Sequence, residues 1–124
     1  MIEIEYKKIF DELQDIIPAN WDEIIFYAEY TSDSYSYKYF VKIKGKYVDC
    51  FNIRGVTEDL LIQKFIKFND IIRPSRVALP DKDKWSVMTM TIRNDGTFNV
   101  DFDYTDISEN SIEYFQKWKA KYLK

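Results

Sequence analysis

The hydrophobic residues of this sequence change their spacing along the chain, and this change limits the fold to a mixture of helices and strands. Apolar side chains recur at helical spacing over roughly residues 3–17, 57–73 and 108–122. Over residues 21–51 and 85–104, apolar and polar side chains alternate, as they do in strands. Because one segment cannot satisfy both periods, each change of spacing marks a new element. The pattern therefore excludes an all-helical chain and an all-strand chain.

The first alternating region predicts three consecutive strands. Turn-forming residues at 31–34 and 44–46 divide it, which leaves strands over about 21–30, 35–43 and 47–51. Strands that follow one another through short turns pair as an antiparallel meander.

The second and third helices carry start and stop signals. Thr57 is placed to cap the second helix, and two carboxylates follow it in the first turn. We expect Arg73 and Pro74 to end this helix, because proline removes a helical N–H and clashes with the preceding turn. Residues 74–84 then form a loop. Ser108 is expected to cap the last helix.

The hairpin around Asn94, Asp95 and Gly96 has a register that the sequence can select. A two-residue loop would place apolar residues of the first strand opposite carboxylates of the second, whereas a three-residue loop shifts the pairing by one residue. The longer loop puts these apolar side chains on one buried face: Met88, Met90, Ile92, Phe98, Val100, Phe102 and Tyr104. Asp101 and Asp103 then project from the opposite face.

These elements give the order αβββαββα. We therefore expect an α+β fold in one domain spanning residues 1–124, with a five-stranded antiparallel sheet and the helices packed on one face.

The composition argues against an enzyme. The 124 residues include no His and one Cys, which removes the usual general base, the usual metal ligand and a thiolate zinc site. We expect Cys50 to be a buried, unreactive thiol. Asp101 and Asp103 lie two residues apart on one strand and could hold a divalent cation, with Asp106 just beyond. A metal-dependent hydrolase is therefore one alternative, but no phosphate loop or third ligand motif accompanies it. We expect no cofactor, metal or catalytic residue.

The charges are segregated along the chain. Acidic residues occur without any base over residues 9–37 and 94–116, and the net charge is −3. Such stretches are either ordinary solvated faces or a surface for a basic protein partner. Our candidate partner-binding residues combine acids of the second stretch with tyrosines that share one strand face: Asp101, Asp103, Asp106, Glu109, Glu113, Tyr35, Tyr37 and Tyr39. We expect no direct nucleic-acid partner, no membrane segment or export signal, and a cytoplasmic location.

Three segments resemble the YezG/EsaG-like antitoxin family. They are "IFDELQDIIPANWDEI", "WSVMTMTIRNDGTFNVDFDYTD" and "YFQKWKAKYLK". The order and spacing of the matching residues cover nearly the whole chain, whereas residues 44–56 and 73–84 depart from the pattern. The matching residues are Ile17, Pro18, Asn20, Trp21, Trp85, Gly96, Phe98, Asp101, Asp103 and Tyr104.

The resemblance implies a specific function. Members of this family are small cytoplasmic immunity proteins that partner secreted polymorphic toxins, notably nucleases exported by the type VII secretion system. It implies that this chain is an antitoxin that neutralises a cognate toxin, most simply a nuclease, by stoichiometric protein–protein interaction. From the residues alone, a generic protein-binding adaptor module remains a second alternative.

Overall fold

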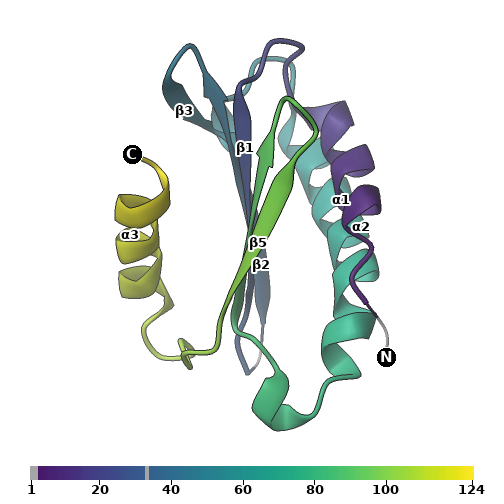
Figure 1. Ribbon diagram of the computed structural model, residues 1–124, viewed down its shortest axis with the longest axis vertical. Coiled ribbons are helices and arrows are strands. Elements are labelled where there is room, and N and C mark those ends of the chain that lie inside the picture. Colours follow the sequence, from purple (N-terminus) through teal and green to yellow (C-terminus); the bar gives the residue numbers. More distant parts are fainter. Residues whose placement is uncertain (1–2, 33) are drawn as a thin grey trace.

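The computed structural model describes residues 3–32 and 34–124, and its elements follow the expected order αβββαββα (Figure 1). The elements are α1 (Tyr6–Leu13), β1 (Glu23–Tyr30), β2 (Tyr35–Ile43), β3 (Lys46–Asp49), α2 (Glu58–Val77), β4 (Val87–Arg93), β5 (Phe98–Asp103) and α3 (Ser111–Tyr122). Three short 3-10 helices, Gln14–Ile16, Cys50–Asn52 and Asp81–Asp83, lie in the connections. The turn expected at 31–34 is closed by the N–H of Thr31, which donates to the carbonyl of Ser34 over 2.9 Å; Asp33 lies outside the described residues.

The five strands form one antiparallel sheet in the order β3-β2-β1-β4-β5. β1 lies at its centre, where Glu23 pairs with Lys42 of β2 on one side and with Arg93 of β4 on the other. The expected α+β class and antiparallel five-stranded sheet are confirmed.

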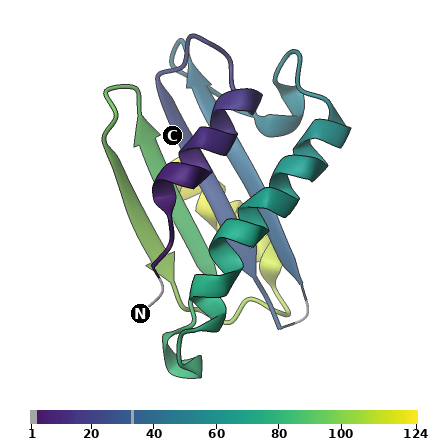
Figure 2. The same ribbon diagram turned by 90° about the vertical axis from the view of Figure 1, so that its right-hand side faces the viewer.

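We expected all helices to pack on one face of the sheet, and this expectation is wrong. α1 and α2 cover one face of the sheet and α3 covers the other (Figures 1 and 2). Phe26 packs on Phe68 of α2 with ring centroids 5.0 Å apart, whereas its neighbour Tyr27 packs on Trp118 of α3 at 4.8 Å. The reason is that β1 reads as a nearly continuous apolar run, EIIFYAEY, so both of its faces must be covered.

The hairpin of β4 and β5 has the expected three-residue loop. Arg93 donates its N–H to the carbonyl of Thr97 over 2.9 Å, and Gly96 adopts a φ of +90°, which only glycine adopts without strain. Met90 pairs with Val100, so the apolar residues of the two strands share a face, as expected.

That shared face is buried on β4 but not on β5. Met88 and Met90 are fully covered, while the large side chains of β5 and its exit stay in part exposed: Phe98 by 47%, Phe102 by 37% and Tyr104 by 60%. The difference arises because β5 is an edge strand that the helices cover only in part, through contacts such as that of Tyr6 in α1 with Phe98 (Figure 2).

Two expected helix boundaries are wrong. α2 continues through Pro74 to Val77, because its last turn is held by tertiary contacts: Ser75 is buried and Arg76 donates its Nε–H to the carbonyl of Trp85 over 2.7 Å. α3 begins at Ser111 rather than at a Ser108 cap; the Ser108 hydroxyl instead accepts from the backbone of Ser32. Thr57 caps α2 as expected.

Candidate functional site

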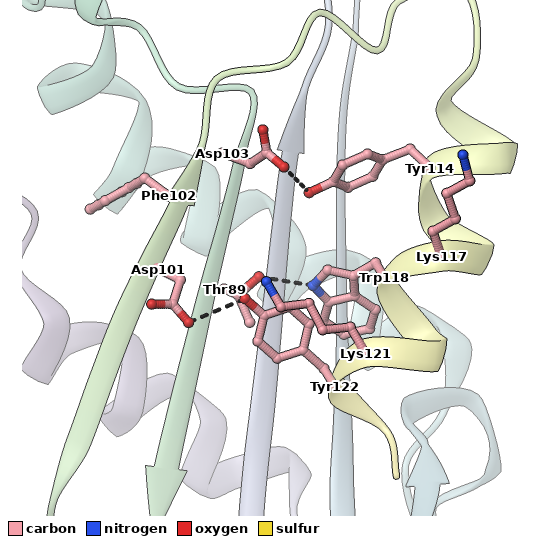
Figure 3. Close-up of a pocket in the computed structure, with 9 residues that line it drawn as sticks. All are labelled: Thr89, Asp101, Phe102, Asp103, Tyr114, Lys117, Trp118, Lys121 and Tyr122. Atoms are coloured by element: carbon pink, nitrogen blue, oxygen red, sulfur yellow. Dashed lines mark hydrogen bonds between the residues drawn. The ribbon is translucent and has the colours of Figure 1, made fainter.

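A cleft separates β5 from α3 on the sheet face opposite α1 and α2 (Figure 3). Its volume is about 410 Å³. The lining residues come from β4, β5 and α3, and they are Thr89, Asp101, Phe102, Asp103, Tyr114, Lys117, Trp118, Lys121 and Tyr122. Two of the sequence-predicted partner residues, Asp101 and Asp103, therefore lie together in one concave site.

Both aspartates bind phenol groups of α3. Asp103 accepts a hydrogen bond from the hydroxyl of Tyr114 over 2.8 Å, and Asp101 accepts one from Tyr122 over 3.1 Å. The two carboxylates lie two residues apart on β5, and the two tyrosines lie two helical turns apart on α3. Each hydrogen-bonded pair of an aspartate and a tyrosine therefore bridges the cleft (Figure 3). The backbone N–H of Thr105 also donates to Asp103, which lowers the pKa of this carboxyl group and keeps it ionised.

Trp118 forms the floor of the cleft. Its indole N–H donates to the hydroxyl of Thr89 over 2.9 Å, and its ring stacks on Phe115 at 5.5 Å. The indole is 3% exposed, so it fixes the position of α3 on the sheet and offers little surface to a partner.

The cleft carries both signs of charge. Lys117 and Lys121 line it on the side of α3, next to the acidic stretch of residues 94–116 that contains no base. Glu113 pairs with Lys117 over 3.3 Å, with both side chains largely exposed. Sequence reasoning missed these lysines as site residues, although their spacing of four on a helix predicts that they share a face.

Asp106 and Glu109 lie outside the cleft. They occupy the exposed connection between β5 and α3, where Asp106 accepts the backbone N–H of Ser108 over 3.0 Å. This hydrogen bond lowers the pKa of the Asp106 carboxyl group. The predicted acidic set therefore follows the chain from the cleft, through this connection, to Glu113 in the first turn of α3.

The hypothesis of three tyrosine anchors fails for Tyr37 and Tyr39. Tyr39 is fully buried and donates to the carbonyl of Ile16 over 2.7 Å, and Tyr37 is 3% exposed and donates to Asn69 over 3.1 Å. Only Tyr35, which is 45% exposed at the start of β2, presents its ring to solvent. The three residues share a face as expected, but α2 covers most of it.

Among residues 3–32 and 34–124, no group of three or more His, Cys, Asp or Glu side chains is arranged to hold a metal ion. The pair of Asp101 and Asp103, which the hydrolase alternative would use, is instead engaged by tyrosines. Cys50 is fully buried, and this burial raises the pKa of its thiol to about 11.

Within the same described ranges, every helix is too short or too polar to cross a lipid bilayer.

A small α+β protein with a cleft of mixed charge and aromatic side chains exposed along a sheet edge has the features of a protein-binding domain. The sequence model of the family described as "Immunity protein YezG-like" matches residues 2–124, and the chain belongs to this family.

Two relatives carry the name "Immunity protein YezG". The protein from Bacillus spizizenii strain W23 is 25% identical over 130 aligned positions, which cover 95% of this chain and 80% of the relative. The protein from Bacillus subtilis strain 168 is 24% identical over 128 positions, which cover 95% of this chain and 85% of the relative. The family resemblance inferred from the sequence is confirmed.

Proposed function

We propose that this protein is a cytoplasmic antitoxin that binds one cognate toxin and neutralises it by stoichiometric contact, without catalytic turnover. The observation that carries the proposal is the family match over residues 2–124. The absence of His from the sequence and the engagement of Asp101 and Asp103 by tyrosines are consistent with a binding role.

The toxin that we propose is a nuclease exported by a type VII secretion system. A nuclease must hold phosphate groups with basic side chains, and an acidic inhibitor is complementary to such a surface. The acidic rim, defined as Asp101, Asp103, Asp106, Glu109 and Glu113, supports this proposal, because four of its five residues are exposed. Tyr35 remains the one candidate aromatic anchor among the three tyrosines of β2.

The test is reconstitution with the toxin domain encoded beside the gene of this protein. Calorimetric titration should give one antitoxin per toxin, and DNA cleavage by the toxin should stop at that ratio. The antitoxin alone should show no nuclease activity with or without Mg²⁺. Failure to bind, or inhibition at ratios far below one, would contradict the proposal.

A charge-reversal experiment tests the acidic rim. The exposed residues Asp101, Asp106 and Glu109 are changed to Lys, and the matched control changes Asp11, Asp22 and Asp70, which are also exposed. Both variants change the net charge equally, so a general charge effect acts on both. If the rim steers the toxin, the first variant alone should associate at least about tenfold more slowly at low salt, since steering acts mainly on association. Equal association rates for the two variants would contradict a role for the rim.

A further inference from the structure

The outer edge of β5 is unpaired. In an antiparallel ladder, hydrogen-bonded and non-hydrogen-bonded pairs alternate. Because Arg93 donates its N–H to Thr97 of the β5 side, the pairs of β4 with Asn99, Asp101 and Asp103 are the hydrogen-bonded ones. The backbone groups of Phe98, Val100 and Phe102 therefore point away from β4, and the described sheet has no strand beyond them.

The side chains of these three residues form one half of an apolar surface. Phe98 and Phe102 are 47% and 37% exposed, and Val100 between them is half-buried. A groove of about 510 Å³ lies where Phe98 meets Tyr6 and Phe10 of α1, and a second one of about 490 Å³ lies where Phe102 meets Trp85, Leu79 and Tyr104. The surface thus follows the free edge of β5 on the side of α1.

The other face of the same strand carries two carboxylates. Asn99, Asp101 and Asp103 alternate with the apolar residues and project on the side of α3. A strand added beside β5 would place its own alternate side chains against these two surfaces.

We propose that β5 accepts an extended segment of the partner as an additional strand, in which apolar residues alternate with Lys or Arg. The apolar residues would pack beside Phe98, Val100 and Phe102, and the basic residues would lie beside Asp101 and Asp103. The backbone of the three apolar residues supplies the hydrogen bonds, as in other cases of strand addition. That the partner is the toxin rests on the function proposed above.

A second copy of this chain does not fit the same edge. Pairing β5 with β5 would bring together two strands that each carry Asp101 and Asp103 and no basic residue, and like charges on neighbouring strands destabilise a sheet. The opposite edge of the sheet is a weaker candidate, because β3 has only four residues and begins at the charged Lys46.

Hydrogen exchange of single amides tests the proposal directly. The amides of Phe98, Val100 and Phe102 should exchange quickly in the free protein, whereas those of Asn99 and Asp101, which bond to β4, should be protected. In the complex with the toxin domain, exchange of the three outward amides should slow at least about tenfold, with little change at Asn99 and Asp101.

Two substitution pairs test the same strand through affinity. Val100→Pro removes an outward N–H at an edge position that tolerates proline, and Val100→Ala keeps the N–H while shortening the same side chain. We expect the proline variant to bind about 10- to 100-fold more weakly than the alanine variant. The double change Phe98→Lys and Phe102→Lys should also weaken binding, whereas Ile62→Lys and Ile66→Lys, at 50% and 53% exposed positions of α2, should not.

The outcomes separate the two proposals. A one-to-one inhibitory complex in which the outward amides still exchange quickly, or in which the two Val100 variants bind equally, overturns strand addition and leaves the antitoxin function in place. The absence of any complex overturns the antitoxin function, and strand addition to the toxin with it. Circular dichroism of each variant establishes that the fold is kept.

Discussion

The indole Nε1 of Trp118 lies 2.9 Å from the hydroxyl oxygen of Thr89, and this hydrogen bond joins α3 to β4. Both residues are buried, so neither group can exchange its partner for water. The substitution Thr89→Val keeps the shape of the side chain and leaves the indole N–H of Trp118 without an acceptor. We expect this change to lower the free energy of unfolding by about 1–3 kcal/mol, measured by urea denaturation.

A double-mutant cycle isolates that hydrogen bond. In a Trp118→Phe background there is no indole N–H to leave unpaired, so Thr89→Val should cost clearly less than it does in the original protein. Equal costs in the two backgrounds would show that the loss comes from packing.

Lys64 of α2 binds two carboxylates, Glu12 of α1 and Asp15 of the 3-10 helix that follows α1. Its ammonium group lies 2.9 Å from Glu12 and 2.6 Å from Asp15, and the lysine side chain is 7% exposed. Lys64→Met keeps the apolar stem and leaves Glu12 without its main partner, so we expect a loss of about 1–3 kcal/mol in chemical denaturation. Lys67→Met is the control: Lys67 is 58% exposed at 3.4 Å from Glu12, and its loss should cost less than about 1 kcal/mol.

The same ion pair predicts a dependence of stability on pH. Hydrogen bonds from Lys64 lower the pKa of Glu12 and of Asp15 in the folded protein. The stability that this lowering provides is complete above the ordinary carboxyl pKa of about 4, and it is lost as the pH falls through the folded-state values. Denaturation curves between about pH 5 and pH 3 should therefore show a smaller loss of stability for Lys64→Met than for the original protein.

Substitutions of two residues on opposite faces of the hairpin, Met90 and Asp101, test its register. Met90 is 1% exposed, and Met90→Asp buries an unpaired charge, which should cost about 3–5 kcal/mol. Met90→Leu is the matched control and should cost less than about 1.5 kcal/mol. Asp101 is exposed and makes one hydrogen bond with Tyr122, so Asp101→Ala should change stability by less than about 1 kcal/mol. Thermal melts that rank the two polar changes in the opposite order would contradict the register.

Cys50 should resist modification in the folded protein. Burial raises the pKa of its thiol to about 11, so at about pH 8 only about one molecule in a thousand carries the reactive thiolate. Labelling with a disulfide reagent should be slow in buffer and fast in denaturing urea, and the native rate should rise with pH toward the folded-state pKa. A native rate equal to that of a free cysteine peptide would contradict this prediction.

The order of the elements and the hairpin register could be read from the sequence because they depend on local signals. Alternation fixes which residues share a face, and the choice of loop around Gly96 follows from matching Met90 with Val100. The family was also accessible, since its matching residues are spread along the whole chain.

The features that the sequence did not predict depend on tertiary contacts. The alternation along β1 does not show that the face of Tyr27 is buried as fully as the face of Phe26, so the position of α3 was not predicted. Pro74 stays helical because the turn that follows packs on the sheet. The burial of Tyr37 and Tyr39, and the exposure of Phe98, follow from strand order: β2 lies beneath α2, and β5 lies at an edge.

The central position of β1 also bears on how the chain folds as it is synthesised. One neighbour of β1 follows it almost at once in the sequence, but the other, Val87–Arg93, is made only after the whole of α2. The apolar run EIIFYAEY keeps an open edge until Val87–Arg93 leaves the ribosome, and the face that carries Tyr27 stays uncovered until α3 follows. The last third of the protein therefore completes the fold, first by pairing β4 with the open edge of β1 and then by covering its second face with α3.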